Sequence, residues 1–356
     1  MSPHYQLHTD LLNWYRHNHR ELPWRENSSP YRVWLSEIIL QQTRVDQGLP
    51  YYLKFVDHYP TVRHLAEADL DLVLKDWQGL GYYSRARNMH QCAQVVMDQF
   101  NGEFPKSASE LAKLPGIGPY TASAIASICF QEPTAVVDGN VFRVVARLTN
   151  SNIPINSTEG KRYFATEAHH LLNPVDPGTH NQAMMELGAL VCTPRNPSCP
   201  VCPLRLYCDG LKNNRVDELP VKMGKSVRRT RYFNYLVVQT DCLFIRQRLD
   251  RDVWFMLHDF PLVETEEKVN NWSEVISLFQ TKYDLDLGND TNLLDPVHEK
   301  HILSHQTIQA TFWRLQPKSI RFGADSNIFE ADLEDIEERY AVPILIKNYL
   351  SNLNAK

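Results

Sequence analysis

The segment 111–140 constrains the fold of this chain more than any other, because it combines a glycine turn, a helical pattern and an isolated carboxylate. The sequence LPGIG at residues 114–118 predicts a tight turn between two helices, since glycine permits positive φ and Pro119 suits the first turn of the next helix. Small and apolar residues then recur at a spacing of three to four. A short extended run, 134–137, leads directly to Asp138. The pattern therefore predicts a helical hairpin followed by an acidic residue.

A hairpin of this kind suits the binding of an anion. The N–H groups of Gly116, of Gly118 and of the next helix start would point outward, where the helix dipole favours a group such as a DNA phosphate. Such contacts bind the nucleic acid backbone and do not read sequence. An LPGIG turn alone is often a plain connection, and an isolated Asp-Gly is often a turn. The combination with Asp138, 20 positions after Gly118, favours the functional interpretation.

This combination resembles the helix-hairpin-helix DNA glycosylase superfamily, in which the acid at the position of Asp138 is catalytic. The endonuclease III branch of that superfamily carries a Schiff-base lysine at the position of Tyr120. A tyrosine cannot form an imine. The resemblance therefore implies an enzyme that cuts only the glycosidic bond and uses water as its final nucleophile.

Length and composition limit the class of protein. At 356 residues the chain can form two domains with buried cores. No run of 18 apolar residues is present, and residues 1–20 are polar and lack the apolar core of a signal peptide. We therefore expect a cytoplasmic, nucleoid-associated protein that does not enter a membrane.

The net charge of −5 is distributed unevenly along the chain. Residues 1–225 contain 22 Lys and Arg and 22 Asp and Glu, whereas residues 226–356 contain 15 and 20. The excess of acid therefore lies entirely in the C-terminal part. A neutral N-terminal part can still present a basic groove to DNA, because phosphate contacts depend on local clustering of charge.

A helical pattern over residues 31–45 carries Glu37 and Gln41 four residues apart on one face. A single helical glutamate usually faces solvent. However, the phrase SEIILQQTRV closely resembles the helix that supplies the second acid in MutY-type adenine DNA glycosylases, and this resemblance covers nearly the whole chain. The preceding segment has a helix at about 5–19 and then Trp24-Arg25, which could be a surface stack or could contact a base.

The loop DWQGLGYYSRARN at residues 76–88 has two readings. It could be a glycine-rich loop that opens a solvated basic helix. The family resemblance instead implies that Gln42 and Tyr82 enter the base stack beside a lesion, as inserted side chains do when a base is extruded. The DNA-contacting residues expected around these two phrases are Gln42, Thr43, Arg44, Leu80, Gly81 and Tyr82.

Four of the seven cysteines lie close together with the spacing C-x6-C-x2-C-x5-C. A disulfide set is not expected in a cytosolic chain of this size. Structural zinc and an iron–sulfur cluster remain as alternatives, but only one CxxC pair is present. The resemblance to the endonuclease III and MutY branches implies a 4Fe-4S cluster. Its ligands would be Cys192, Cys199, Cys202 and Cys208.

After residue 231 the pattern changes from helical to alternating, which predicts a second, α+β domain. We expect a glycosylase region at 1–225, mainly α-helical, and a separate domain at 226–356. Strands are predicted at 232–238, 242–245, 253–257 and 310–315, and helices at 271–283 and 333–353. The second domain resembles the Nudix-like C-terminal domain of MutY enzymes. It lacks the Gly-x5-Glu-x7-Arg-Glu pattern, so pyrophosphate hydrolysis is not expected.

In MutY enzymes this domain checks for 8-oxoguanine through a loop usually written Phe-Ser-His. The corresponding phrase here is Leu303-Ser304-His305. Leu303 removes the ring but keeps an apolar contact, and Ser304 keeps the hydroxyl that could bond the altered edge of the lesion. Ser304 and His305 are therefore the expected lesion-reading residues, although an ordinary loop before an edge strand is the competing interpretation.

The chemistry that the resemblance implies needs two carboxyl groups, as in glycoside hydrolysis through an oxocarbenium-like state. We expect Glu37 to protonate adenine at N7, Asp138 to stabilise the sugar cation, and Tyr120 and Asn140 to orient Asp138 and water. Glu37 must then hold a proton near neutral pH. The adenine pocket carried over by the resemblance consists of Arg20, Leu22, Trp24, Arg25, Leu40 and Gln182.

The expected substrate is double-stranded DNA with adenine opposite 8-oxoguanine or guanine, bound by a monomer. A lyase of the endonuclease III type is disfavoured by Tyr120, by Glu37 and by the C-terminal domain. A lesion-binding protein without activity would not need both acids. A Nudix hydrolase would need the absent metal-binding glutamates.

Overall fold

The computed structural model describes residues 5–26, 28–224, 228–288 and 290–354. It divides into two compact units that are not continuous in sequence. Unit 1 comprises Met1–Glu67 and Asn88–Gly224, and unit 2 comprises Ala68–Arg87 and Lys225–Lys356. A part of the first 225 residues, segment 68–87, thus packs with the C-terminal part. The boundary expected from the sequence at 225–226 lies outside the described residues.

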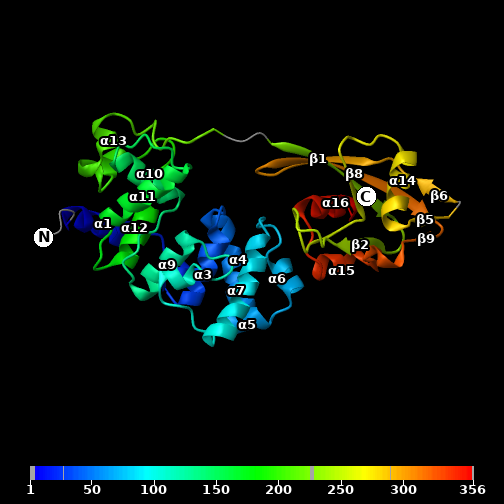
Figure 1. Cartoon of the computed structure of the whole chain (residues 1–356), viewed down its shortest axis with the longest axis horizontal. Helices are drawn as coiled ribbons and strands as arrows, with labels where there is room; N and C mark the ends of the chain where they lie inside the picture. Colours follow the sequence, from blue (N-terminus) through cyan, green and yellow to red (C-terminus); the bar gives the residue numbers. More distant parts are fainter. Residues whose placement is uncertain (1–4, 27, 225–227, 289, 355–356) are drawn as a thin grey trace. The chain divides into compact units, whose positions relative to one another are not determined.

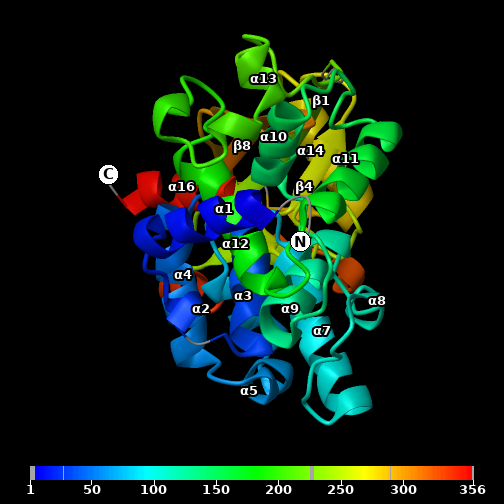
Figure 2. The same ribbon diagram turned by 90° about the vertical axis from the view of Figure 1, so that its left-hand side faces the viewer.

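Unit 1 is helical (Figures 1 and 2). Its elements are α1 (Tyr5–Asn18), α2 (Pro23–Glu26), α3 (Pro30–Leu40), α4 (Val45–His58), α5 (Val62–Glu67), most of α7 (Ser84–Phe100), α8 (Ala108–Leu111), α9 (Pro119–Phe130), α10 (Gly139–Leu148), α11 (Thr158–Leu171), α12 (Pro177–Leu190), the 3-10 turns η1 (Cys199–Val201) and η2 (Arg205–Tyr207), and α13 (Asp209–Lys212). The mainly α-helical N-terminal fold is confirmed.

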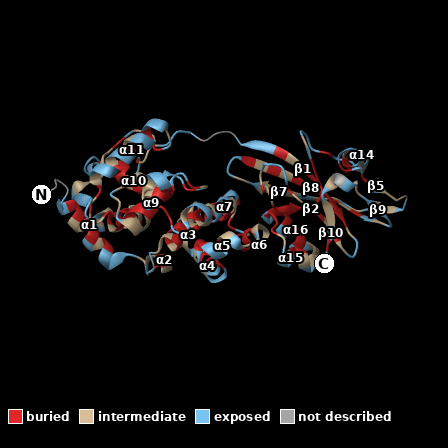
Figure 3. Cartoon of the chain, turned by 60° about the horizontal axis from the view of Figure 1, so that its bottom comes forward, coloured by how far each residue is buried: buried red, intermediate tan, exposed pale blue. Residues whose placement is uncertain are grey.

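Helix α12 organises the core of unit 1. It packs against α1, α9 and α10, and α3 packs against α9 and α4. Buried residues mark the inner sides of these helices, whereas exposed residues mark their outer sides (Figure 3). Leu11 of α1, Val145 of α10 and Leu187 of α12 belong to one apolar cluster and are almost fully buried. This packing fixes the helices that bear the expected catalytic residues relative to one another.

The predicted hairpin is confirmed between α8 and α9. Gly116 has a φ of 73°, and a Cβ at this position would lie 2.7 Å from Cβ of Asn88, so both its backbone and its surroundings require glycine. Gly118 is the N-cap residue of α9, and Pro119 is the first residue of the helix. Among the described residues, no side chain forms a capping hydrogen bond at this start of the helix. The first-turn N–H groups are thus left for an external acceptor.

Unit 2 contains α6 (Leu70–Asp76), the start of α7, and a C-terminal α+β part. The remaining elements are β1 (Arg229–Val238), β2 (Leu243–Gln247), β3 (His258–Asp259), β4 (Leu262–Thr265), α14 (Trp272–Tyr283), β5 (Asp286–Leu287), β6 (Thr291–Leu293), β7 (Val297–Ile302), β8 (Gln306–Pro317), β9 (Ile320–Arg321), the 3-10 turn η3 (Ala324–Ser326), β10 (Ile328–Ala331), α15 (Leu333–Glu338) and α16 (Ile344–Asn354).

The main sheet of unit 2 has the order β4-β1-β8-β6, and β7 also pairs with β8. Strands β1 and β8 run parallel, and the other pairs in this sheet are antiparallel. Neighbouring residues of β8 face opposite sides: Trp313 packs in the cluster that includes Phe279 of α14, and Phe312 stacks on Tyr349 of α16. Helices therefore cover both faces of the sheet, and the expected α+β class is confirmed. The likeness to Nudix domains stays a prediction.

Two predicted elements of unit 2 were wrong in detail. Residues 253–257, predicted as a strand, form turns in which Trp254 and Met256 have positive φ and Leu257 N–H donates to the carbonyl of Trp254 at 3.0 Å. Apolar content alone misled the prediction. The single helix predicted at 333–353 is two helices, α15 and α16. The break lies before Pro343, whose ring disfavours a helical conformation of the preceding residue.

None of the described helices is long and apolar enough to cross a membrane.

Candidate active site

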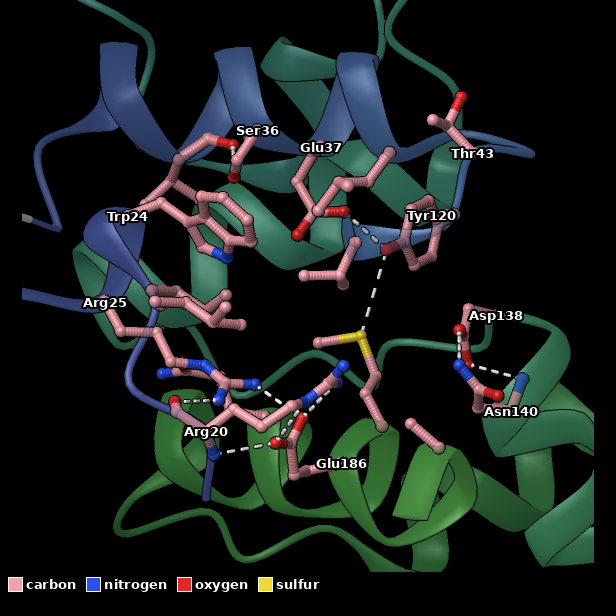
Figure 4. A pocket seen from close by; sticks show the side chains of 18 residues that line it. Arg20, Trp24, Arg25, Ser36, Glu37, Thr43, Tyr120, Asp138, Asn140 and Glu186 are labelled. Carbon is pink, nitrogen blue, oxygen red and sulfur yellow. Dashed lines mark hydrogen bonds and ion pairs between the residues drawn. The ribbon is translucent and has the colours of Figure 1, made fainter. Parts of the chain in front are cut away.

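A cavity of about 180 Å³ in unit 1 collects side chains from α2, α3, α9, α12 and the start of α10 (Figure 4). All ten residues expected to act in catalysis or adenine binding line it, although they come from five separate stretches of sequence. These residues are Arg20, Leu22, Trp24, Arg25, Glu37, Leu40, Tyr120, Asp138, Asn140 and Gln182. The folded chain thus brings the whole expected set to one place.

Glu37 projects into this cavity from α3, and the hydroxyl of Tyr120 donates a hydrogen bond to its carboxyl group (Figure 4). Burial raises the pKa of Glu37 to about 7, the hydrogen bond from Tyr120 opposes this rise, and the nearby Asp138 adds to it. Near neutral pH, Glu37 is therefore poised between its protonated and charged forms, as a general acid requires.

Asp138 is the N-cap of α10. One carboxyl oxygen accepts hydrogen bonds from the backbone N–H groups of Asn140, at 2.9 Å, and Val141, at 2.7 Å. The other oxygen accepts from the side-chain amide of Asn140 at 2.8 Å. Burial raises the pKa of Asp138, and these hydrogen bonds oppose the rise. The cap thus fixes the carboxylate at the cavity edge and favours its charged form.

Asn140 is itself positioned by a close helix contact. A Cβ at Gly188 of α12 would lie 2.5 Å from Cβ of Asn140, so a side chain at that position would displace Asn140. Arg143 Nη2 also donates to the amide oxygen of Asn140 at 2.9 Å. The hydrogen bond from its side-chain amide to Asp138 is the contact through which Asn140 would orient the carboxylate. Tyr120, which we expected to orient Asp138, instead bonds Glu37.

The opposite wall of the cavity is a charge cluster that the sequence did not reveal. Arg20 donates to both carboxyl oxygens of Glu186, at 2.8 and 2.7 Å, and Arg25 donates to one of them at 2.8 Å. Arg25 also donates to the backbone carbonyl of Arg20 at 2.8 Å. Glu186 lies four residues after Gln182 and hence on the same face of α12. This spacing is the feature of the sequence from which Glu186 could have been predicted as a cavity residue.

The remaining wall is apolar. Leu22 and Trp24 are buried, and Trp24 packs edge to face on Tyr52 with ring centroids 5.0 Å apart. Met185 was not expected, but its sulfur lies 3.8 Å from the hydroxyl of Tyr120. A cavity with an apolar wall, an acid and two guanidinium groups is suited to a flat heterocycle with ring nitrogens.

Of the residues near this cavity that are expected to contact DNA, some are exposed on the surface and one lines the cavity. Gln42 is exposed with a φ of 58°, an unfavourable conformation for a residue other than glycine, and Arg44 is the exposed N-cap of α4. Thr43 lines the cavity itself. Gly116 and Gly118 are exposed on the hairpin.

The other expected DNA-contacting residues lie in unit 2, around a second cavity of about 520 Å³. Leu80, Gly81, Tyr82, Ser304 and His305 line it. The Tyr82 and Ser304 hydroxyls form a hydrogen bond, and Tyr82 has a φ of 48°. The side chain of Leu80 is buried, its N–H donates to the carbonyl of Trp77 at 3.1 Å, and its carbonyl accepts from Arg85 Nη2 at 3.2 Å. Ser304 and His305 are exposed in the turn between β7 and β8.

The four clustered cysteines follow α12 and surround η1 and η2. Among the described residues, no group of three or more Cys, His, Asp or Glu is arranged to hold a metal ion. The thiols of Cys192, Cys199 and Cys208 nevertheless lie near enough to raise the pKa of Cys202, to which burial contributes most. Arg147 Nη1 donates to Cys192 Sγ at 3.3 Å. Neighbouring thiols with a cationic donor are chemically suited to an iron–sulfur cluster.

Comparisons with known proteins identify the family to which the chain belongs. Residues 35–164 match the HhH-GPD superfamily of base excision DNA repair proteins. The chain is 36% identical to the adenine DNA glycosylase of Buchnera aphidicola subsp. Baizongia pistaciae, over 84% of this chain and 82% of that protein. It is 30% identical to the adenine DNA glycosylase of Schizosaccharomyces pombe, over 97% and 89%. A thermostable thymine-DNA glycosylase structure is similar with a TM-score of 0.54 and 25% identity, over 58% of this chain and 95% of that one.

Proposed function

Because the chain belongs to the adenine DNA glycosylase family of the HhH-GPD superfamily, and is thus a DNA N-glycosylase of base excision repair, we propose that it removes adenine paired with 8-oxoguanine or guanine. It does so by hydrolysis and leaves the DNA backbone intact. The observation that carries the proposal is the pairing of Glu37 with Asp138 across one cavity, the first with a pKa of about 7 and the second as a helix cap.

The proposed reaction begins with an extruded adenine in the cavity. Glu37 donates its proton to N7 of the base, which makes adenine a neutral leaving group. As the glycosidic bond breaks, positive charge develops on the sugar, and the carboxylate of Asp138 stabilises it. Water then adds to the sugar carbon and gives one proton to the carboxylate of Glu37, which restores the acid. Tyr120 has no amine, so no imine forms and the backbone is not cut.

The charged wall and the apolar wall bind the base in this scheme. Arg20, Arg25 and Gln182 supply polar groups for the ring edge, and Leu22, Trp24 and Leu40 supply apolar contact. The hairpin N–H groups and Arg44 hold phosphates, and Gln42 and Tyr82 support the stack from which the adenine leaves. Ser304 and His305 read the 8-oxoguanine.

Cys192, Cys199, Cys202 and Cys208 would hold a 4Fe-4S cluster. When bound, this group supplies structural cross-linking of the loop that follows α12. The excision chemistry is carried by the protein side chains alone.

The test is single-turnover release of adenine from duplexes with adenine opposite 8-oxoguanine, guanine or thymine, assayed with and without alkali. We expect release opposite 8-oxoguanine and guanine, with strand breaks only after alkali. Glu37→Gln and Asp138→Asn should bind the lesion duplex and leave the adenine attached. Strand breaks without alkali would indicate a lyase, and tight binding without release by the unmodified chain would indicate a binding protein.

A further inference from the structure

Glu186 is a buried carboxylate of the cavity wall for which the proposed chemistry has no step. Only 1% of its side chain is exposed, yet it lies on α12 among apolar neighbours. Its oxygens accept four hydrogen bonds: from Nε, Nη2 and the backbone N–H of Arg20, and from Nη2 of Arg25, all within 2.9 Å. These bonds hold the pKa of Glu186 at about 2 against the effect of burial, so it is a full negative charge at neutral pH.

This arrangement sets the charge of the wall that faces Glu37 (Figure 4). Two guanidinium groups and one carboxylate leave a balance of one positive charge. Arg25 already favours the charged form of Glu37. Without the carboxylate of Glu186, the positive charge of both arginines would act on Glu37 with no local compensation, and both side chains would lose the acceptor that fixes their position.

We propose that Glu186 is a positioning residue for adenine excision: its carboxylate fixes Arg20 and Arg25 in the cavity wall and offsets part of their charge, and thereby keeps the proton on Glu37. This inference rests on the proposed function, because it concerns the acid that protonates the base. It assigns to Glu186 an effect on the reaction that a residue used only for packing would not have.

Other groups also face this part of the cavity, and the test must leave them unchanged. Tyr120 and Cys129 on α9, Asp138 before α10, and Arg25 on α2 interact with Glu37. Both arginines also interact with Tyr15 on α1, and Arg20 interacts with Asp46 on α4. A substitution confined to Glu186 changes the charge of the wall and leaves the chemical identity of each of these groups unchanged.

The experiment is single-turnover adenine release from pH 5.5 to 8.5 for the full chain and for Glu186→Gln and Glu186→Asp. The exposed Glu159→Gln serves as the control for loss of one negative charge elsewhere in unit 1. For Glu186→Gln we expect the alkaline limb of the profile to move about one pH unit toward acid, since one uncompensated nearby charge shifts a carboxyl by about that amount. If the pKa of Glu37 falls from about 7 by one unit, the protonated fraction at pH 7 falls about fivefold.

The variants separate charge from packing. Glu186→Asp keeps the charge and should keep the midpoint even if the rate is lower, and Glu159→Gln should match the unmodified chain. A uniform loss of rate in Glu186→Gln with an unchanged midpoint would overturn the proposal. If Glu186→Gln releases no adenine at any pH, Glu186→Asp decides the question, because it keeps the negative charge of the wall. Release by Glu186→Asp with the original midpoint would support the proposal, and loss of release in Glu186→Asp as well would overturn it.

The same assay distinguishes this inference from the proposed function. No adenine release by the unmodified chain would refute the function, and the role of Glu186 would fall with it. Release by the unmodified chain together with the unchanged midpoint in Glu186→Gln would refute the role of Glu186 alone.

Discussion

The phenol of Tyr120 on α9 donates a hydrogen bond to the carboxyl group of Glu37 on α3. At the position where the family resemblance places the lysine of the endonuclease III branch, this chain thus has a hydrogen-bond donor to Glu37. The bond stabilises the charged form of Glu37 and lowers its pKa, in opposition to burial. In the proposed reaction Tyr120 would therefore adjust the pKa of Glu37 as well as exclude an imine.

Replacing Tyr120 with Phe should shift the alkaline limb of the excision profile toward higher pH, because Glu37 would lose a hydrogen bond that favours its charged form. The maximal rate should fall, since the carboxyl would also lose a fixed orientation. Single-turnover rates across the pH range provide the measurement. A limb that stays in place or moves toward acid would contradict the assignment.

Glu37 should also make the stability of the fold depend on pH. Its pKa is raised from 4.5 to about 7 in the folded chain, so the folded state binds more protons than the unfolded state between these values, and stability falls as pH rises through them. By the time the pH exceeds 7, the free energy of unfolding should have fallen by roughly 2 kcal/mol, allowing for partial exposure of Glu37. Urea unfolding of the unmodified chain and of Glu37→Gln at pH 5 and pH 8 measures it. The stability of Glu37→Gln relative to the unmodified chain should rise with pH, and an equal difference at both values would refute this.

Asp138 caps α10 and has a proposed chemical role, and two substitutions can separate the two. Asn is as good an N-cap as Asp, so Asp138→Asn should retain the cap of α10 and abolish excision. Asp138→Ala should abolish excision and also destabilise the fold by about 1 kcal/mol. Thermal unfolding beside the excision assay measures both effects. Equal stability of the two variants would show that the cap contributes little.

Features set by local chemistry could be predicted from the sequence. The turn at Gly116 and the start of α9 at Pro119 follow from the conformational limits of glycine and proline. The residues of the cavity were instead carried over from the family resemblance. Features set by distant contacts could not. Arg20 and Glu186 are 166 residues apart, and Tyr120 and Glu37 are 83 apart. Without the fold, Glu186 could not be distinguished from a solvent-facing helical glutamate.

Segment 68–87 shows the same limit at the level of whole elements. Lys75 donates to the carbonyls of Ile336 and Tyr340, and Arg87 donates to the carbonyl of Phe255 at 2.7 Å. These partners are about 170 to 265 residues away along the chain. The helix at 70–76 was not predicted, and neither was the unit in which it packs, because that depends on which distant carbonyls become available.

The cysteine loop should contain iron rather than zinc. If the four thiols hold a 4Fe-4S cluster, elemental analysis of the purified chain should give about four irons per chain, together with acid-labile sulfide and visible absorption. Cys202→Ser should lose these signals and destabilise unit 1, whereas Cys242→Ser, a free cysteine of unit 2, should retain them. One zinc per chain with no labile sulfide would instead identify a structural zinc site.

Preference for 8-oxoguanine should depend on Ser304, and a point substitution tests this better than truncation. Removing residues 226–356 would strip the carbonyl partners from Lys75 and Arg87 and expose segment 68–87, so any loss of activity would mix recognition with damage to that segment. Ser304→Ala removes only an exposed hydroxyl that bonds Tyr82. We expect adenine release opposite 8-oxoguanine to slow by about fivefold to tenfold, which corresponds to one hydrogen bond of about 1 kcal/mol, and release opposite guanine to change little. Tyr82→Phe is the matched control, since it removes the same hydrogen bond and leaves the Ser304 hydroxyl free. If both variants lose the preference equally, the bond between the two residues, and not contact of Ser304 with the lesion, accounts for it.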